Sequence, residues 1–251
     1  KKLSVDLSSV SKAEKCTLSL KVGNTEYANR YPVWVYPVKQ DFSHSEDIVV
    51  TDKLDASLKQ QLKEGKKVLY FPNLKKYEKS TVGGLFQTDY WNYRMFRTIC
   101  ENIKKPVSPG TMGLLMNPEH SLFTEFPTEY HTNWQWFPII KSSRPLILDN
   151  MPSEYKPIIQ VIDNIERNHK LGLLFEFKVG EGKLLVCMSD ILSVQDKPEA
   201  RQFYYALLKY MDSDSFNPSS TVDVNELDQL FEYNGRKNSI QSLRNISYDT
   251  D

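Results

Sequence analysis

Hydrophobic and polar positions alternate over the first 37 residues, and this pattern changes further along the chain. The alternation in "LSVDLS" and "CTLSLKVG", together with the aromatic run "YPVWVYP", predicts three short strands, with Gly23-Asn24 at one turn. Three strands cannot bury both of their faces. We therefore interpret residues 1–38 as the end of a β-sandwich or as a sheet extension, followed by a polar linker over 39–46.

After the linker, apolar strands alternate with amphipathic helices. "DIVVTD" and "KKVLYFP" predict strands on either side of a helix over 54–65, in which Leu54, Leu58 and Leu62 recur at the helical period. A fully apolar strand such as "KKVLYFP" is typical of a parallel sheet covered on both faces. The strand–helix–strand order predicts an α/β sheet, so we expect an α/β domain over 47–213.

The sequence pattern over the rest of this domain predicts both helices and strands. A second amphipathic helix is expected over 89–103, and residues 119–143 predict two helical pieces broken at Pro127. "TMGLLM", "PLILDN" and "PIIQVIDN" predict strands, and "KPEARQFYYALLKYMDSD" predicts a closing helix with Pro198 in its first turn.

Two further segments complete the expected organisation. "KLGLLFEFKVGEGKLLVCMSD" predicts a β-hairpin with Gly180-Glu181-Gly182 at its turn. Residues 214–251 are rich in Ser, Asn and Asp and predict a C-terminal extension with one short helix, "VNELDQLFEYNG".

Composition and charge narrow the classes of function. Lys+Arg and Asp+Glu both number 32 in the 251 residues. A nucleic-acid-binding protein usually carries a basic excess, so no nucleic-acid partner is expected. No apolar run approaches the ~18–20 residues of a membrane-spanning helix, so no membrane span is expected. The start, "KKLSVDLSSV", shows no signal peptide and resembles the middle of a strand, which indicates a fragment of a longer protein.

Metal, cofactor and redox chemistry find little support in the sequence. Cys16, Cys100 and Cys187 are widely spaced in apolar segments, so we expect three free thiols. The four His are scattered rather than set at ligand spacing. No glycine-rich nucleotide-binding motif is present, and we expect neither a metal nor a cofactor.

The stretch "FTEFPTEYHTNWQWFPII" (123–140) sets aromatic rings beside carboxylates, as sugar-binding pockets do. A glycosidase needs two carboxyl groups, about 5–5.5 Å apart when it retains configuration and further apart when it inverts. Glu125 with Glu129, and Asp163 with Glu166, are the available pairs, and neither lies in a recognised signature. The candidate carbohydrate or interface contacts are Tyr90, Trp91, Glu129, His131, Trp134, Trp136, Asp163 and Asn164.

Two observations favour packing over catalysis for these residues. In a helix Trp134 and Trp136 cannot share one face, so one is expected in the core and the other against a neighbouring element. An amidotransferase would need a Cys in a tight strand-to-helix turn, whereas the strand "KKVLYFP" leads into Asn73-Leu74. We therefore assign no catalytic residue to this chain.

A family resemblance adds to this interpretation. The runs "GGLFQTDYWNY", "GTMGLLMNPEHSLFTEFPTEYHTNWQWFPII" and "YKPIIQVIDNIERNHKLGLLFEFKVGEGKLLVCMSDI" resemble the C-terminal region of large glycoside hydrolase family 2 proteins of Bacteroidetes, which are β-galactosidase-like and sugar-binding. The resemblance covers about residues 80–193. It implies a flavodoxin-like, class I amidotransferase-like three-layer sandwich of the kind that also serves as a trimerisation domain. Residues 1–37 are similar to the end of the preceding immunoglobulin-like sandwich.

The resemblance also implies a function. The family acts in polysaccharide breakdown and is exported to the periplasm, and its catalytic glutamates lie in a barrel domain that this chain does not contain. The expected function is therefore a non-catalytic accessory domain that contacts the catalytic barrel and β-sandwich domains of the same polypeptide, with a second copy and carbohydrate as further candidate partners. The alternative is a small independent α/β hydrolase acting on sugars, with a site near Glu129, His131 and Asp163.

Overall fold

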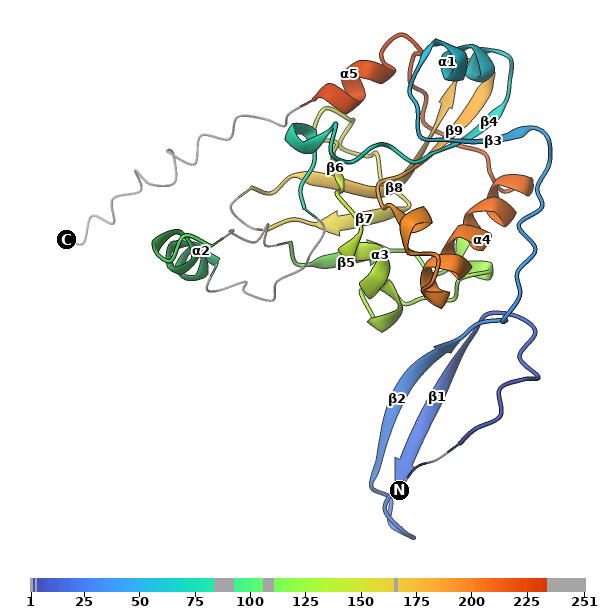
Figure 1. Ribbon diagram of the computed structural model, residues 1–251, viewed down its shortest axis with the longest axis vertical. Helices are drawn as coiled ribbons and strands as arrows, with labels where there is room; N and C mark the ends of the chain where they lie inside the picture. The colour runs from blue at the N-terminus through green and yellow to red at the C-terminus, as the bar shows by residue number, and fades with distance from the viewer. Residues whose placement is uncertain (1, 3, 84–92, 106–110, 165–166, 234–251) are drawn as a thin grey trace.

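The chain folds into a two-stranded antiparallel ribbon and a larger α/β body (Figure 1). The structure is a computed structural model that describes residues 2, 4–83, 93–105, 111–164 and 167–233. Among these residues, no helix is long and apolar enough to cross a bilayer.

The ribbon pairs β1 (Glu14–Lys21) with β2 (Ala28–Val35). Its register sets Cys16 opposite Val33 and Leu18 opposite Tyr31, so the apolar side chains of both strands share one face. Gly23 turns the chain with a φ of 50°. Two of the three predicted strands therefore form. The third prediction, for "LSVDLS", is wrong, because residues 4–8 are irregular and pair with neither strand of the ribbon.

The body contains a mixed seven-stranded sheet, which confirms the α/β class. The strand order is β3 (Ile48–Thr51), β4 (Lys67–Tyr70), β9 (Gly182–Cys187), β8 (Lys170–Val179), β7 (Ile159–Ile162) and β5 (Gly113–Met116), with the short β6 (Leu146–Ile147) paired to β8. Neighbouring strands are parallel from β3 to β9 and antiparallel from β9 to β5. Consecutive residues of β8 and β9 are buried, so both faces at the centre of the sheet are covered.

The helices that cover the parallel part of the sheet form where the spacing of apolar residues predicts them. In α1 (Ala56–Lys63), Leu58 and Leu62 are buried, and the side chain of Asp55 caps the helix by accepting from the backbone N–H of Leu58 at 3.0 Å. α4 (Pro198–Asp212) buries a stripe that contains Phe203, Ala206, Leu207 and Tyr210, and α3 (Phe137–Lys141) packs against this helix. The helix predicted over 89–103 forms in its described part as α2 (Tyr93–Asn102).

The two helical pieces predicted over 119–143 form, but both are shorter than expected. Before Pro127 there is only the 3-10 turn η2 (Ser121–Thr124), and after it the 3-10 turn η3 (Trp134–Trp136) leads into α3, with extended chain between the two pieces. This extended segment pairs with the outer edge of β5: Leu115 bridges to His131, and the N–H of Met116 donates to the carbonyl of Tyr130 at 3.2 Å. Edge strands need such partners for their backbone groups.

The segment after residue 213 is part of the body up to its last described residues. Phe216 and Phe231 are fully buried, the second on α5 (Leu227–Glu232) beside η1 (Glu78–Ser80). The N–H of Lys178, at the end of β8, donates to the carbonyl of Ser220 at 2.8 Å. The boundary expected at 213 therefore does not separate residues 214–232 from the core. The remaining 3-10 turn, η4 (Ile191–Val194), precedes α4.

The three cysteines are free thiols, as predicted. Cys187 is buried at the end of β9, whereas Cys16 on the ribbon and Cys100 on α2 are half-buried. They lie in three different elements of the fold.

Candidate functional site

The two tryptophans of the aromatic stretch point in different directions, as predicted. The side chain of Trp136 is 0% exposed, whereas Trp134 is 83% exposed. The Trp136 ring lies edge-on to Phe126, with ring centroids 5.1 Å apart, and its Nε1–H donates to the Thr128 hydroxyl at 3.0 Å. Trp136 is therefore a core residue, as expected. Trp134 is exposed, so, contrary to the prediction, it does not lie against a neighbouring element of the described chain.

Glu129 and His131 lie where the ribbon joins the body. Glu129 accepts a hydrogen bond from Lys15 of β1 at 2.6 Å, and its second carboxyl oxygen is 3.9 Å from the Nε2 of His131. Close by, the hydroxyl of Tyr36 donates to the Gln135 side chain at 2.6 Å. Because these bonds link segments about a hundred residues apart, the predicted stretch forms a joint between ribbon and body.

Asp163 belongs to a different network. Its carboxylate is buried and accepts from Arg167 at 2.6 Å and from the N–H of His169 at 3.0 Å. The side chain of Asn164 accepts from the N–H of Arg167 at 2.9 Å, so both residues hold the loop after β7. Asp163 shares none of these partners with Glu129. The alternative hydrolase site requires Asp163 to lie beside Glu129 and His131. The structure does not bring Asp163 together with these two residues. Tyr90, Trp91 and Glu166 lie outside the described residues.

A cavity of about 1080 Å³ opens at the carboxyl ends of the parallel strands β3, β4 and β9, where α/β proteins commonly bind ligands. Three serines line it, and their hydroxyls all donate to backbone carbonyls: Ser142 to Pro138, Ser143 to Ile140 and Ser193 to Asp190. An activated nucleophile would instead be bonded to a base. These serines close turns, and no histidine lines the cavity among the described residues.

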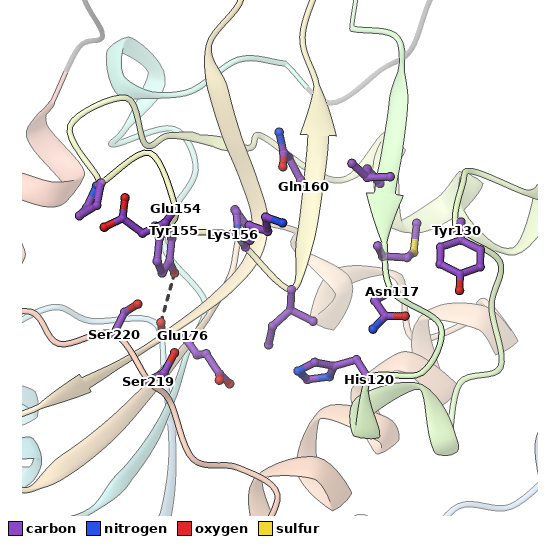
Figure 2. A pocket seen from close by; sticks show the side chains of 15 residues that line it. Asn117, His120, Tyr130, Glu154, Tyr155, Lys156, Gln160, Glu176, Ser219 and Ser220 are labelled. Carbon is purple, nitrogen blue, oxygen red and sulfur yellow. Dashed lines mark hydrogen bonds between the residues drawn. The ribbon is translucent and has the colours of Figure 1, made fainter.

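A second cavity, of about 650 Å³, was not predicted from the sequence (Figure 2). It lies beside β5, β7 and β8 and is bordered by the segment that contains Ser219 and Ser220. Its polar lining residues are Asn117, His120, Tyr130, Glu154, Tyr155, Lys156, Gln160, Glu176, Ser219 and Ser220. Within the described chain, no group of three acidic, histidine or cysteine side chains is placed to hold a metal ion.

Glu176 is one of the two acidic side chains among the described residues that line this cavity. It lies on β8, and its Oε2 accepts from the hydroxyl of Tyr210 on α4 at 2.7 Å. Burial raises the pKa of the Glu176 carboxyl above its ordinary value, against the opposing effects of the Tyr210 hydrogen bond and the positive charge of Lys183. A carboxyl group with a perturbed pKa in a cavity is a recognised mark of a functional site.

His120 reaches the cavity from the opposite side (Figure 2). Its Nδ1 accepts from the backbone N–H of Leu122 at 3.3 Å and so caps η2, which leaves the proton of the neutral ring on Nε2. Burial lowers the pKa of the His120 ring, which favours this neutral form. The ring is therefore a fixed, uncharged hydrogen-bond donor.

Replacing Glu176 with glutamine should stabilise the fold at neutral and alkaline pH. The folded-state pKa of Glu176 lies above the unfolded value, so stability is lost as pH rises through the folded pKa and the carboxyl ionises. We expect E176Q to melt above the wild type at pH 8, by about 2–4 °C for each kcal/mol gained. The difference should disappear below pH 4.5, the ordinary value.

Thermal melts of E176Q across this pH range check the prediction, with the exposed Glu119→Gln as the matched control. The control should melt with the wild type at every pH. A lower melting temperature for E176Q at pH 8 would contradict a half-buried, ionised Glu176.

The fold and site define an α/β domain with a mixed sheet and a polar cavity, preceded by an antiparallel ribbon. Residues 49–232 match the family described as a domain of unknown function, DUF8487, and the chain belongs to that family. Residues 1–37 match a second domain of unknown function, DUF8488. The interval between the two matches contains the linker predicted over 39–46. No curated protein matches the chain.

Proposed function

We propose that this chain is a non-catalytic accessory unit of a multidomain glycoside hydrolase that acts in polysaccharide breakdown. In this proposal it docks to the β-sandwich and catalytic barrel domains of the same polypeptide, which is exported to the periplasm. The observation that carries the proposal is the uncovered apolar face of the ribbon.

That face has the pattern of one half of a sandwich. Leu18 and Leu20 of β1 and Tyr31 and Val33 of β2 are all exposed on it. The opposite face pairs Thr17 with Pro32, Ser19 with Arg30 and Lys21 with Ala28, so it is mainly polar. An isolated two-stranded ribbon is at best marginally stable in water. Packing on a second sheet would bury the apolar face as in other sandwiches.

The body offers a second exposed apolar site near the same joint. Trp134 and Phe137 are both exposed, and Gln135 between them binds Tyr36, which directly follows β2. Exposed tryptophans supply much of the binding energy at protein interfaces. We propose that Trp134 and Phe137 contact the barrel domain when the sandwich covers the ribbon.

The same proposal includes a flavodoxin-like fold for the body. The β3–α1–β4 unit and its parallel neighbour β9 are consistent with the flavodoxin-like, amidotransferase-like three-layer arrangement implied by the family resemblance. In such a domain the ligand cavity lies at the carboxyl ends of the strands. Here the serine hydroxyls at that edge are engaged by backbone carbonyls, which supports an accessory role.

An activity assay tests the non-catalytic part of the proposal. The chain should release no nitrophenol from nitrophenyl galactosides, glucosides or mannosides above the buffer rate, because the family resemblance assigns the catalytic glutamates to a barrel domain outside this chain. Glu154, which lines the same cavity as Glu176, is exposed and accepts a hydrogen bond from its neighbour Ser153. Turnover that is abolished by Glu129→Gln or Glu176→Gln would overturn the proposal, and turnover that both variants retain would point to a contaminating enzyme.

Replacing Trp134 with alanine tests the docking part. The exposed side chain contributes little to the core, so the melting temperature should stay within about 2 °C of the wild type. Association with the remaining domains of the polypeptide, supplied as a separate fragment, should weaken at least tenfold in a sedimentation titration. Leu192→Ala, at an exposed site on the cavity at the carboxyl ends, is the matched control and should bind normally. Unchanged binding of W134A would contradict the assigned role.

A further inference from the structure

We propose that the cavity between β5, β7, β8 and residues 219–220 binds an uncharged sugar residue of a glycan chain, held by Glu176, His120 and Asn117. The choice of a glycan rests on the proposed function, whereas the hydrogen-bonding pattern and the charge preference come from the cavity itself. This site overlaps the aromatic stretch at 123–140 at one residue, Tyr130.

The size and lining of the cavity suit a small ligand. Its volume of about 650 Å³ lies within the range of ~300–1,000 Å³ that is typical of ligand sites. Leu115, Met116 and Ile158 supply apolar lining. The polar side chains of Asn117, His120 and Glu176 reach the same space (Figure 2). Ligand sites usually combine a mainly apolar wall with a few placed polar groups in this way.

The polar groups that face the space have unused hydrogen-bonding capacity. Tyr210 occupies Oε2 of Glu176, and within the described chain no donor bonds to Oε1, so it is an available acceptor. Nε2–H of His120 is an available donor. The Oδ1 of Asn117 accepts from the N–H of Glu119 at 3.1 Å, which leaves its NH₂ group to donate. A sugar hydroxyl both donates and accepts, so it can bond to Glu176 and to His120 or Asn117 at once.

The supporting residues hold this arrangement in place. The hydroxyl of Tyr155 donates to the backbone carbonyl of Glu176 at 3.1 Å, and its ring stacks on Phe177, with centroids 5.0 Å apart. The ring of His120 packs against that of Tyr210, 5.2 Å between centroids. Polar groups that are fixed before binding lose less entropy when the ligand arrives.

Tyr130 supplies an aromatic surface at the rim. Its side chain is 60% exposed, although its carbonyl is held by the N–H of Met116. The apolar C–H face of a sugar ring packs on such exposed aromatic rings, while the hydroxyl edge meets polar groups. The cavity therefore offers both kinds of surface that a sugar ring presents.

Charge argues against an anionic ligand. Glu176 and Glu154 bring negative charge to the lining, and the only lysine or arginine among the described lining residues is the exposed Lys156 at the rim. Lys183, the cation whose charge acts on Glu176, does not line the cavity and donates to the carbonyl of Phe216 at 2.8 Å. A phosphate or a uronate would meet the Glu176 carboxylate without a buried cation to offset the repulsion.

The inference is tested by titrating the chain with neutral oligosaccharides and monitoring its backbone amide chemical shifts. Galacto-, gluco-, manno- and xylo-oligosaccharides are titrated separately, with galacturonan oligosaccharides as the charged comparison. At least one neutral series should shift the amides of residue 176 and of the non-proline residues in 115–120 and 155–160 in a saturable way. Glu176→Gln and Tyr130→Ala should each weaken this binding at least tenfold, whereas Trp134→Ala should leave it unchanged.

Three results would overturn the inference: no neutral series shifts these amides at 10-fold molar excess and millimolar ligand, both cavity variants bind as the wild type does, or galacturonan binds more tightly than every neutral series. None of these three results changes the outcome expected from the docking and turnover experiments, which test the proposed function separately. Conversely, turnover of a bound glycan would overturn the accessory function while the site itself stands.

Discussion

Replacing Gly182 with valine is expected to destabilise the chain by about 3 kcal/mol or more, at the upper end of the cost of overpacking a core. A Cβ at this position would lie 2.6 Å from the carbonyl oxygens of Leu62 and Lys66 and 2.9 Å from the Cα of Leu62. All three are backbone atoms at the end of α1 and just beyond it, so no side chain can rotate away. Either β9 or α1 must move, and β9 lies between β4 and β8 with every residue buried except the half-buried Lys183.

Thermal unfolding checks this expectation, and a drop of about 6–12 °C corresponds to 3 kcal/mol in a chain of this size. Gly180→Ala is the matched control at the same turn. Gly180 has a φ of 60°, and its Cβ would meet nothing closer than 3.4 Å, so only the left-handed backbone is strained and the cost should be about 1 kcal/mol. An unchanged midpoint for Gly182→Val would show that α1 does not lie against β9 as described.

Replacing Trp136 with alanine should cost about 3–5 kcal/mol, the usual range for removing a fully buried large aromatic side chain. The ring packs against Phe126 at 5.1 Å, Phe203 at 5.3 Å and Phe123 at 6.4 Å between centroids, which ties the loop to α4. The Thr128 hydroxyl also loses the indole N–H that donates to it. Trp134→Ala removes the same side chain from an exposed position and should cost within ±0.5 kcal/mol.

Urea unfolding of the two tryptophan variants, compared at equal m-values, measures this difference directly. The expected outcome is a large shift of the midpoint for Trp136→Ala and almost none for Trp134→Ala. Equal shifts would mean that the assignment of one ring to the core and the other to the surface is wrong.

Local patterns identified the elements whose packing depends on their own periodicity. Leu58 and Leu62 lie one helical turn apart and become the buried face of α1, and the glycine pair at 180 and 182 marks the hairpin. Gly182 was predicted to belong to the turn, whereas the turn has a two-residue loop with the positive φ at Gly180. Gly182 is the first residue of β9, and the close approach of α1 requires it. A neighbour distant in sequence sets that requirement.

Features that depend on partners distant in sequence could not be predicted from the local pattern. Residues 128–132 are extended because the edge of β5 needs hydrogen-bond partners, a tertiary effect that overrides their apparent helical period. The separation of Trp134 and Trp136 was still correct, because both α-helical and 3-10 geometry turn positions i and i+2 to different sides.

The cavity was missed for a related reason. Glu176 is the only acidic residue in the apolar strand sequence "KLGLLFEFKV", which is a signal that the sequence offered. Its partner Tyr210 lies 34 residues away on α4, and His120 comes from a third part of the chain. Only the fold brings these residues together, so the pattern alone identified a buried strand rather than a site.

The central claim is that the chain is an accessory unit docked through this ribbon. Hydrogen exchange of the ribbon amides tests this claim most directly. The measurement compares the chain alone with the polypeptide that also carries the β-sandwich domain, and it uses the buried amides of β8 as an internal reference. We predict that amides of β1 and β2 exchange at least tenfold more slowly in the longer polypeptide, while those of β8 are unchanged. Equal exchange rates for the ribbon in both proteins would contradict the claim.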